Sequence, residues 1–172
     1  MEFRKTIKLE FSDYLAYNLF SFKRMYIQLA ITIAVIAPLY VYSKRGTVFH
    51  IWIDMFIVFV CAVIVAGLFI MLLIALMKRN LKKQFTSNLV MQAPNDYLLD
   101  DTGVHASSEF GSSNIPWQNV FKAAESKEAF LLYIAKMQAF VLPKRLIGPE
   151  EEAALLAVLR QHMPPNKLKL KK

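Results

Sequence analysis

Asp100, His105 and Ser107 are the residues whose types and proximity could form a hydrolytic site. A serine nucleophile needs a histidine base, and that histidine needs a carboxylate that orients it. These residues, however, flank one short turn, DDTG, and the chain has no Gly-x-Ser-x-Gly elbow. We therefore interpret them as polar residues of a hairpin. We predict no catalytic residue and expect that the protein is not an enzyme.

Histidine and cysteine form no metal-ligand pattern in this sequence. The histidines are His50, His105 and His162, and the single cysteine, Cys61, lies in an apolar run. Zinc sites need clustered ligands at short spacing, such as HExxH, and the five glycines form no phosphate-binding loop. We expect no metal, no cofactor and no intramolecular disulfide, so the fold needs no oxidising compartment.

Basic residues are the remaining candidates for a binding site, because the net charge is +8. Lys144 and Arg145 follow a predicted strand and could bind an acidic partner or a lipid headgroup, or form only a solvated turn. The C-terminal lysines could contact anionic lipid, at about 1 kcal/mol each, or belong to a disordered end. These lysines are Lys167, Lys169, Lys171 and Lys172. No basic face with interleaved aromatic residues indicates nucleic-acid binding.

Two apolar runs predict a transmembrane hairpin. Hydrophobic residues make up 56% of the chain, which is too many for an ordinary soluble domain. Met25–Tyr42 and Met55–Met77 contain no charged residue and approach the roughly 20 helical residues that a bilayer core requires. Small residues on one face of each helix could pack the pair; these are Ala30, Ala34, Ala37, Ala62, Ala66 and Gly67.

Positive charge is distributed unequally around these runs. Five Lys and Arg residues precede the first run, four follow the second in KRNLKK, and only Lys44 and Arg45 lie between them. The positive-inside rule therefore predicts that both termini are cytoplasmic. The leading segment contains three acidic residues and no clear cleavage site, so we expect an uncleaved anchor. Asp54 could belong to a transport path, but its place beside Trp52 favours an interfacial acid that pairs with the loop cations.

The region after the second run predicts a meandering antiparallel sheet, sandwich or barrel. Its expected strands are Asn88–Gln92, Asp96–Asp100, Val104–Glu109, Ser112–Trp117, Asn119–Glu125, Ala129–Ala135 and Ala139–Leu142. A helix from Pro149 to Pro164 follows, with acidic residues in its first turn. Its apolar stripe, which consists of Leu155, Leu156, Leu159 and Met163, should pack on the sheet.

The N-terminal residues are predicted to form a further strand. Phe3, Ile7, Leu9 and Phe11 alternate with polar residues, and Ser12 could cap a helix that begins at Asp13. This strand should join the sheet formed after the hairpin, because its apolar face needs a partner. Trp117 could be a binding anchor, but the position of Ile115 on the same strand face favours a core residue.

From Asp100 to Leu159 the chain resembles the YcxB-like bacterial membrane proteins. The resemblance rests on DDTGVHAS, on SSNIPWQNVFKAAE with Ser113, Ile115 and Trp117, on AFLLYI, and on QAFVLPKRLIGPEE with the step Leu142–Arg145. It implies a pleckstrin-homology-like (PH-like) domain, in which a bent antiparallel sheet is closed by the C-terminal helix, and it supplies no catalytic residues. Phosphoinositide-binding members of the wider fold use basic residues in the first hairpin loop, whereas DDTG is acidic.

The expected fold class is a membrane α-helical hairpin with an α+β cytoplasmic domain. The expected parts are an N-terminal strand and interfacial helix (1–24), the hairpin (25–77), the PH-like domain (78–165) and a basic tail (166–172). We expect a non-enzymatic protein of the bacterial inner membrane that binds membrane lipids and a protein partner, and that could form homo-oligomers. An immunity protein against a membrane-acting secreted toxin, and a small accessory subunit of a transporter, are the alternatives.

Overall fold

The computed structural model describes residues 2–44 and 51–170, apart from the side chains at 38, 41, 42, 44 and 51–55. Contacts within the chain divide it into two compact units. One unit is Ser21–Leu81, and the other combines Met1–Phe20 with Lys82–Lys172. We call the second unit the lobe. The expected pairing of Asp54 with loop cations falls outside the described residues.

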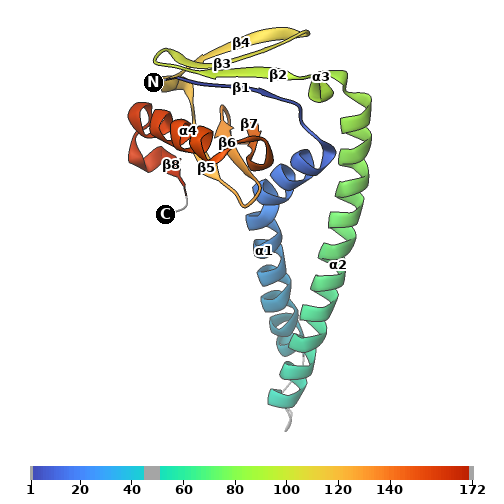
Figure 1. Cartoon of the computed structure of the whole chain (residues 1–172). Helices are drawn as coiled ribbons and strands as arrows, with labels where there is room; N and C mark the ends of the chain where they lie inside the picture. The colour runs from blue at the N-terminus through green and yellow to red at the C-terminus, as the bar shows by residue number, and fades with distance from the viewer. Residues whose placement is uncertain (1, 45–50, 171–172) are drawn as a thin grey trace. The chain divides into compact units, whose positions relative to one another are not determined.

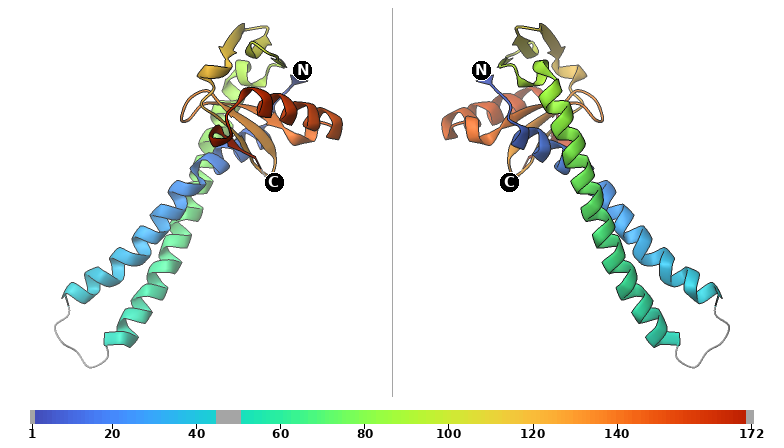
Figure 2. Two further views of the ribbon diagram at one scale, coloured as in Figure 1. Left: turned by 90° about the vertical axis from the view of Figure 1, so that its left-hand side faces the viewer. Right: turned by 90° about the vertical axis from the view of Figure 1, so that its right-hand side faces the viewer.

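Two long helices run through the unit Ser21–Leu81 (Figure 2). They are α1 (Phe11–Lys44) and α2 (Ile51–Ser87). Both are long and apolar enough to cross a membrane, as the two sequence runs predict, over Phe11–Ala37 and Phe56–Ser87.

Small residues lie where these two helices pack. Ala62 and Ala66 of α2 are buried within this unit, as expected for residues that let two helix backbones approach. Gly67 is exposed and is not part of the contact. The Tyr26 hydroxyl donates a hydrogen bond to Met77 Sδ at 3.1 Å, which joins the two helices near the ends of their apolar runs.

The lobe contains two four-stranded sheets (Figure 1). The first has the order β1-β2-β3-β4, is antiparallel throughout, and consists of β1 (Phe3–Ile7), β2 (Asn95–Leu99), β3 (Gly103–Ser108) and β4 (Gly111–Pro116). The second has the order β7-β6-β5-β8 and consists of β5 (Lys122–Glu125), β6 (Ala129–Tyr133), β7 (Ala139–Pro143) and β8 (Leu168–Lys169). No strand pairing joins the two sheets in the described part of the chain, so the described strands form two sheets and no closed barrel.

The strand that precedes α1 joins the sheet, as the sequence predicts. β1 pairs with β2 from Phe3 opposite Leu99 to Ile7 opposite Asn95, and its apolar residues Phe3 and Ile7 are buried. It is therefore the edge strand of a sheet whose other strands all follow the hairpin. The two paired strands, β1 and β2, are separated in the sequence by the whole of α1 and α2.

The start of α1 differs from the expected one. The Asp13 carboxylate accepts a hydrogen bond from the Glu10 backbone N–H at 2.9 Å, which satisfies a donor ahead of the first turn. The helix consequently begins at Phe11, the strand ends at Ile7, and Ser12 is not the cap. A carboxylate three residues into a helix that reaches back to the preceding N–H is the reciprocal half of a capping box.

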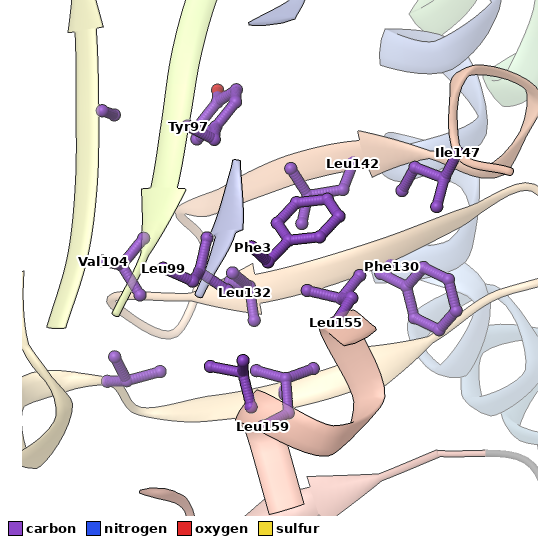
Figure 3. Close-up of a cluster of buried hydrophobic side chains, with 14 of the residues drawn as sticks. Phe3, Tyr97, Leu99, Val104, Phe130, Leu132, Leu142, Ile147, Leu155 and Leu159 are labelled. Atoms are coloured by element: carbon purple, nitrogen blue, oxygen red, sulfur yellow. The ribbon is translucent and has the colours of Figure 1, made fainter. Parts of the chain in front are cut away.

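The larger of two hydrophobic clusters in the described residues lies between the two sheets and the C-terminal helix α4 (Pro149–His162). Figure 3 shows Leu155 and Leu159 of α4 among side chains from both sheets, including Phe3, Leu99 and Leu132. At its start, α4 carries Glu151, which accepts a hydrogen bond from Gly148 N–H and pairs with Lys5 Nζ of β1 at 2.7 Å. The helix thus covers the core, as its apolar stripe predicts. The pair of Glu151 and Lys5 also joins it to the N-terminal strand.

Two further segments differ from the expected ones. Asn88–Gln92 was expected to be a strand, but Leu89–Gln92 forms the short helix α3, because the Asn88 side chain accepts a hydrogen bond from Met91 N–H. The tail was expected to begin at residue 166, but Leu168 and Leu170 pack against the core and β8 runs parallel to β5. Chain order alone does not reveal this late return to the sheet.

Candidate functional site

Lys144, the first basic residue of the predicted contact set, lies in a 3₁₀ turn (Lys144–Leu146) after β7. Its Nζ is 2.5 Å from Glu125 Oε1, 3.6 Å from Glu152 Oε1 and 4.6 Å from the centre of the Phe130 ring. Burial alone would lower the pKa of Lys144, but the hydrogen bond and charge of Glu125, together with Glu152, raise it. The ammonium therefore stays charged and joins β5, the turn and α4.

Arg145 makes a second set of ion pairs, with the segment that leads into α1. Its guanidinium binds the Asp13 carboxylate through two nitrogens, at 2.8 and 3.2 Å, and lies 3.2 Å from Glu10. The hydrogen bond with Asp13 is the main reason that the pKa of Arg145 is raised. The Asp13 side chain is only 8% exposed, so this bidentate pair fastens the start of α1 to the turn after β7.

The two cations are thus engaged within the lobe. Arg145 also borders an open groove of about 610 Å³, which it lines with Thr6, Lys8 and Glu10 among others. An acidic ligand in this groove would meet Lys8 and one side of Arg145. Binding of a partner or headgroup by Lys144 and Arg145 therefore stays a prediction, and their observed contacts are structural.

The tail lysines have different surroundings from one another. Lys167 Nζ donates to the Val120 carbonyl at 2.9 Å, so this cation is bound to the lobe. Lys169 lies in β8 with its side chain exposed, whereas Lys171 and Lys172 lie outside the described residues. Lipid contact by these lysines stays a prediction, and Lys169 is the one whose side chain the structure leaves open to solvent.

The polar hairpin that could suggest catalysis is built around Asp100. Its carboxylate accepts hydrogen bonds from Thr102 N–H and Oγ–H and from Gly103 N–H, and lies 3.1 Å from His105 Nε2. The hydrogen bond from the Thr102 hydroxyl contributes most to holding the pKa of Asp100 well below its usual range. The described contacts of His105 are with Asp100 and Thr102, not with Ser107. The network closes the β2–β3 turn.

Trp117 lies beside this turn, in a 3₁₀ turn (Trp117–Asn119) rather than in the expected strand. Its Nε1–H donates to the Asp100 carbonyl at 2.7 Å, and its ring stacks on that of His162, with centroids 5.2 Å apart. The indole packs against the core, which supports the core interpretation over the binding anchor. No group of three metal-ligating side chains gathers here or elsewhere among the described residues.

A small cavity lies under the hairpin between β6 and β7. Its volume is about 300 Å³, and its walls come from the first turns of α1, the last turns of α2, α3 and the β6–β7 hairpin. The lining is mostly apolar and aromatic; it consists of Leu9, Tyr14, Tyr17, Asn18, Phe85, Met91, Met137, Gln138, Ala139 and Val141. None of these lining residues is an aspartate, glutamate, lysine, arginine or histidine, so the cavity offers mainly apolar and aromatic contact.

A third hollow, an open groove of about 600 Å³, lies beside α3. Leu89 is 68% exposed, and Val90 and Phe110, the latter from the β3–β4 turn, are also exposed. The groove residues carry no charge; they are Gln84, Ser87, Asn88, Leu89, Val90, Met91 and Phe110. Large exposed apolar side chains among uncharged polar residues are typical of a surface that binds another protein.

The part of the chain that carries these features can be compared with known families. Residues 99–159 match the family model of YcxB-like proteins. The match runs from the end of β2 to Leu159 in α4, and it confirms the resemblance read from DDTGVHAS, the S-x-I-x-W segment and LPKR. β1, the two long helices and β8 lie outside the matched residues. No curated protein and no solved structure matched the chain.

Sequence reasoning located LPKR but missed the groove beside α3 and the cavity under β6–β7. The groove depends on Leu89 and Val90, which were assigned to a strand, and on Phe110 in a turn. The signal that could have found it is the cluster of large apolar residues in two segments with strong turn signals. The cavity combines three segments that lie far apart in the sequence, so no local pattern indicates it.

Proposed function

We propose that this protein is a non-enzymatic, multi-pass protein of the bacterial cytoplasmic membrane, with both termini in the cytoplasm, and that it presents its lobe to a protein partner. The observation that carries the proposal is the pairing of β1 with β2. The chain leaves the lobe after β1, passes through two helices of membrane-spanning character, and returns to the same sheet. A lobe built in this way is held at the membrane by both of its connections.

The lobe is also the basis for proposing a PH-like fold. Antiparallel strands are followed by one C-terminal helix that covers the core, which fits the arrangement implied by the YcxB-like resemblance. In this interpretation the transmembrane hairpin occupies the connection between the first two strands. Binding at loops and strand edges, rather than in a catalytic pocket, would then be the ordinary use of the domain.

The groove beside α3 is the surface that we assign to the partner. It lies next to β4, the outer edge strand of the first sheet, in which only Ile115 is partly buried. The Gly103 carbonyl accepts a hydrogen bond from Asp100 N–H, so the backbone groups of Gly103 face β2. Backbone groups of successive residues in a strand face opposite sides, and the β3–β4 register therefore directs the backbone groups of Ser112 and Asn114 away from β3. An extended peptide segment could pair with this edge and place an apolar side chain beside Phe110.

Site-specific photo-crosslinking in intact cells tests this proposal. A photoreactive residue at Val90, Ser112 or Phe110 should give a discrete adduct with one protein, which mass spectrometry would identify. The same residue at Gln161, an exposed position on α4, is the matched control and should give none. Equal adduct patterns at the groove and at Gln161 would contradict the assignment of the partner to this surface.

A further inference from the structure

The hairpin tip between β6 and β7, Ile134–Gln138, exposes an apolar side chain at its end. Backbone N–H groups of Ile134 and Ala135 donate to the Gln138 carbonyl, at 3.0 and 3.3 Å, so the tip is a closed turn. Met137 at this turn is 57% exposed, and Ala135, Lys136 and Gln138 are exposed too. A large apolar side chain placed in this way contributes little to the stability of the lobe and is available to a partner.

The tip is fastened to α1 on the side of the lobe where the chain leaves for its first apolar run. The Tyr17 hydroxyl donates a hydrogen bond to the Met137 carbonyl at 2.7 Å, and the Tyr17 ring lies 6.4 Å from that of Tyr133. Tyr17 is eight residues before Met25, where the uncharged run begins. At 1.5 Å per residue this is at most about 12 Å of helix, so the tip is held close to any bilayer that α1 enters.

The charged residues near the tip are lysines, which favour contact with an anionic surface. Lys136 is exposed in the tip, and Lys122 Nζ lies 4.3 Å from the centre of the Tyr133 ring. The chain has no acidic residue between Glu128 and Glu150. An exposed apolar side chain beside a lysine suits the boundary between acyl chains and anionic headgroups, because apolar burial and attraction of the cation both favour contact there.

We infer that the β6–β7 tip is a lipid contact, in which Met137 enters the boundary between headgroups and acyl chains and Lys136 pairs with an anionic headgroup. The bilayer is the one that α1 and α2 span, so the inference rests on the membrane anchoring in the proposed function. The tip would fix the tilt of the lobe on the membrane. It is separate from the groove beside α3, whose lining is uncharged.

Lipid quenching of a fluorescent label on the full-length protein tests this inference. In a Cys61→Ser background, Met137→Cys carries the label in vesicles of phosphatidylglycerol and phosphatidylcholine with brominated acyl chains. We expect about threefold lower emission than for the label at Gln161→Cys, an exposed position on α4, because the tip label lies among the acyl chains. Adding Lys136→Glu should reduce quenching in these vesicles but not in vesicles of phosphatidylcholine alone.

A label on the native Cys61, which lies in the second apolar run, reports whether the chain is inserted. Strong quenching at Cys61 together with equal emission from the labels at 137 and 161 would overturn the inference and leave the anchoring intact. Absence of quenching at Cys61 would overturn both the anchoring and the inference. Quenching at 137 that does not respond to Lys136→Glu in anionic vesicles would overturn the assignment of the headgroup to Lys136.

Discussion

Arg145 fastens two segments that are 132 residues apart in sequence, the turn after β7 and the start of α1. Its partner Asp13 is nearly buried and also accepts the hydrogen bond from Glu10 N–H that starts the helix. One carboxylate thus serves both the helix start and the ion pair. Removal of the arginine would leave this carboxylate with a charge and no counter-ion.

Arg145→Met should therefore destabilise the lobe. Loss of one partner from a buried pair costs about 3–5 kcal/mol, and we expect about 1–3 kcal/mol because Arg145 itself is 39% exposed. Urea unfolding of the full-length protein in detergent, followed by Trp117 fluorescence in a Trp52→Phe background, measures the change. Arg4→Met, at an exposed position on β1, is the control and should change stability by less than about 0.5 kcal/mol. Equal stability of the two variants would contradict the fastening role.

Asp100 makes the stability of the lobe depend on pH. Its pKa is depressed, so its contribution is complete above the unfolded-state pKa of about 3.9 and is lost as the pH falls towards and through the lower folded-state value. Asp100→Asn should cost about 1–2 kcal/mol at pH 7, and the difference from the wild type should shrink steadily below about pH 4. Urea unfolding across this pH range measures it. A difference that stays constant or grows on acidification would refute the role of the carboxylate.

Sequence patterns locate single residues better than they locate their partners. The LPKR step and the DDTG turn are visible in the chain, and both lie where the structure has turns. The partners of Lys144 and Arg145 are not visible, because Glu125 and Asp13 come from other elements. A basic pair after a strand therefore looks like an exposed contact site until the fold brings carboxylates to it.

At the scale of elements, α4 is the part of the lobe on which the core most depends. Leu155, Val158 and Leu159 are fully buried against side chains from both sheets. Strands of two separate sheets meet beneath one helix, so the helix covers apolar surface that neither sheet covers by itself.

Leu159→Asp should unfold the lobe. An unpaired charge buried in this core costs several kcal/mol, which is comparable to the whole stability of a small domain. Arg160→Asp changes the neighbouring, exposed residue of the same helix and should leave the unfolding transition almost unchanged. Trp117 fluorescence and near-UV circular dichroism of the full-length protein distinguish the two results. A cooperative unfolding transition that survives in Leu159→Asp would show that α4 is peripheral.

Element prediction succeeds where alternation is long and fails where it is short. β2, β3, β4, β6, β7 and α4 lie close to the expected ranges, because each has a clear period and a turn signal at its ends. α3 has only four residues, so a strand and one helical turn look alike in Leu89–Gln92. β8 has two residues and pairs in parallel with β5, which no local alternation can indicate. The division into two sheets depends on turns whose geometry the residue types do not fix.

At the scale of the whole molecule, the proposed orientation rests on the distribution of positive charge. Five basic residues precede the first apolar run and four follow the second, whereas only two lie between the runs. We expect a cysteine at Thr47, in a Cys61→Ser background, to react with a membrane-impermeant maleimide in intact cells. A cysteine at Thr102 in the lobe should react only after the membrane is permeabilised. The opposite labelling pattern would reverse the proposed topology.

The central claim is that one lobe is assembled from the segments on both sides of the hairpin formed by α1 and α2. β1 contributes two buried apolar side chains, and full burial of each is worth about 1.5–3 kcal/mol, so the lobe should not be stable without it. Amide hydrogen exchange of the full-length protein in lipid nanodiscs tests this most directly. The account predicts that the β1 amides that pair with β2 are protected to the same degree as those of β2 and β3, and lose protection together with them in Leu159→Asp. Free exchange of β1 beside protected β2 and β3 would contradict it, and would show that the lobe begins only after the second helix.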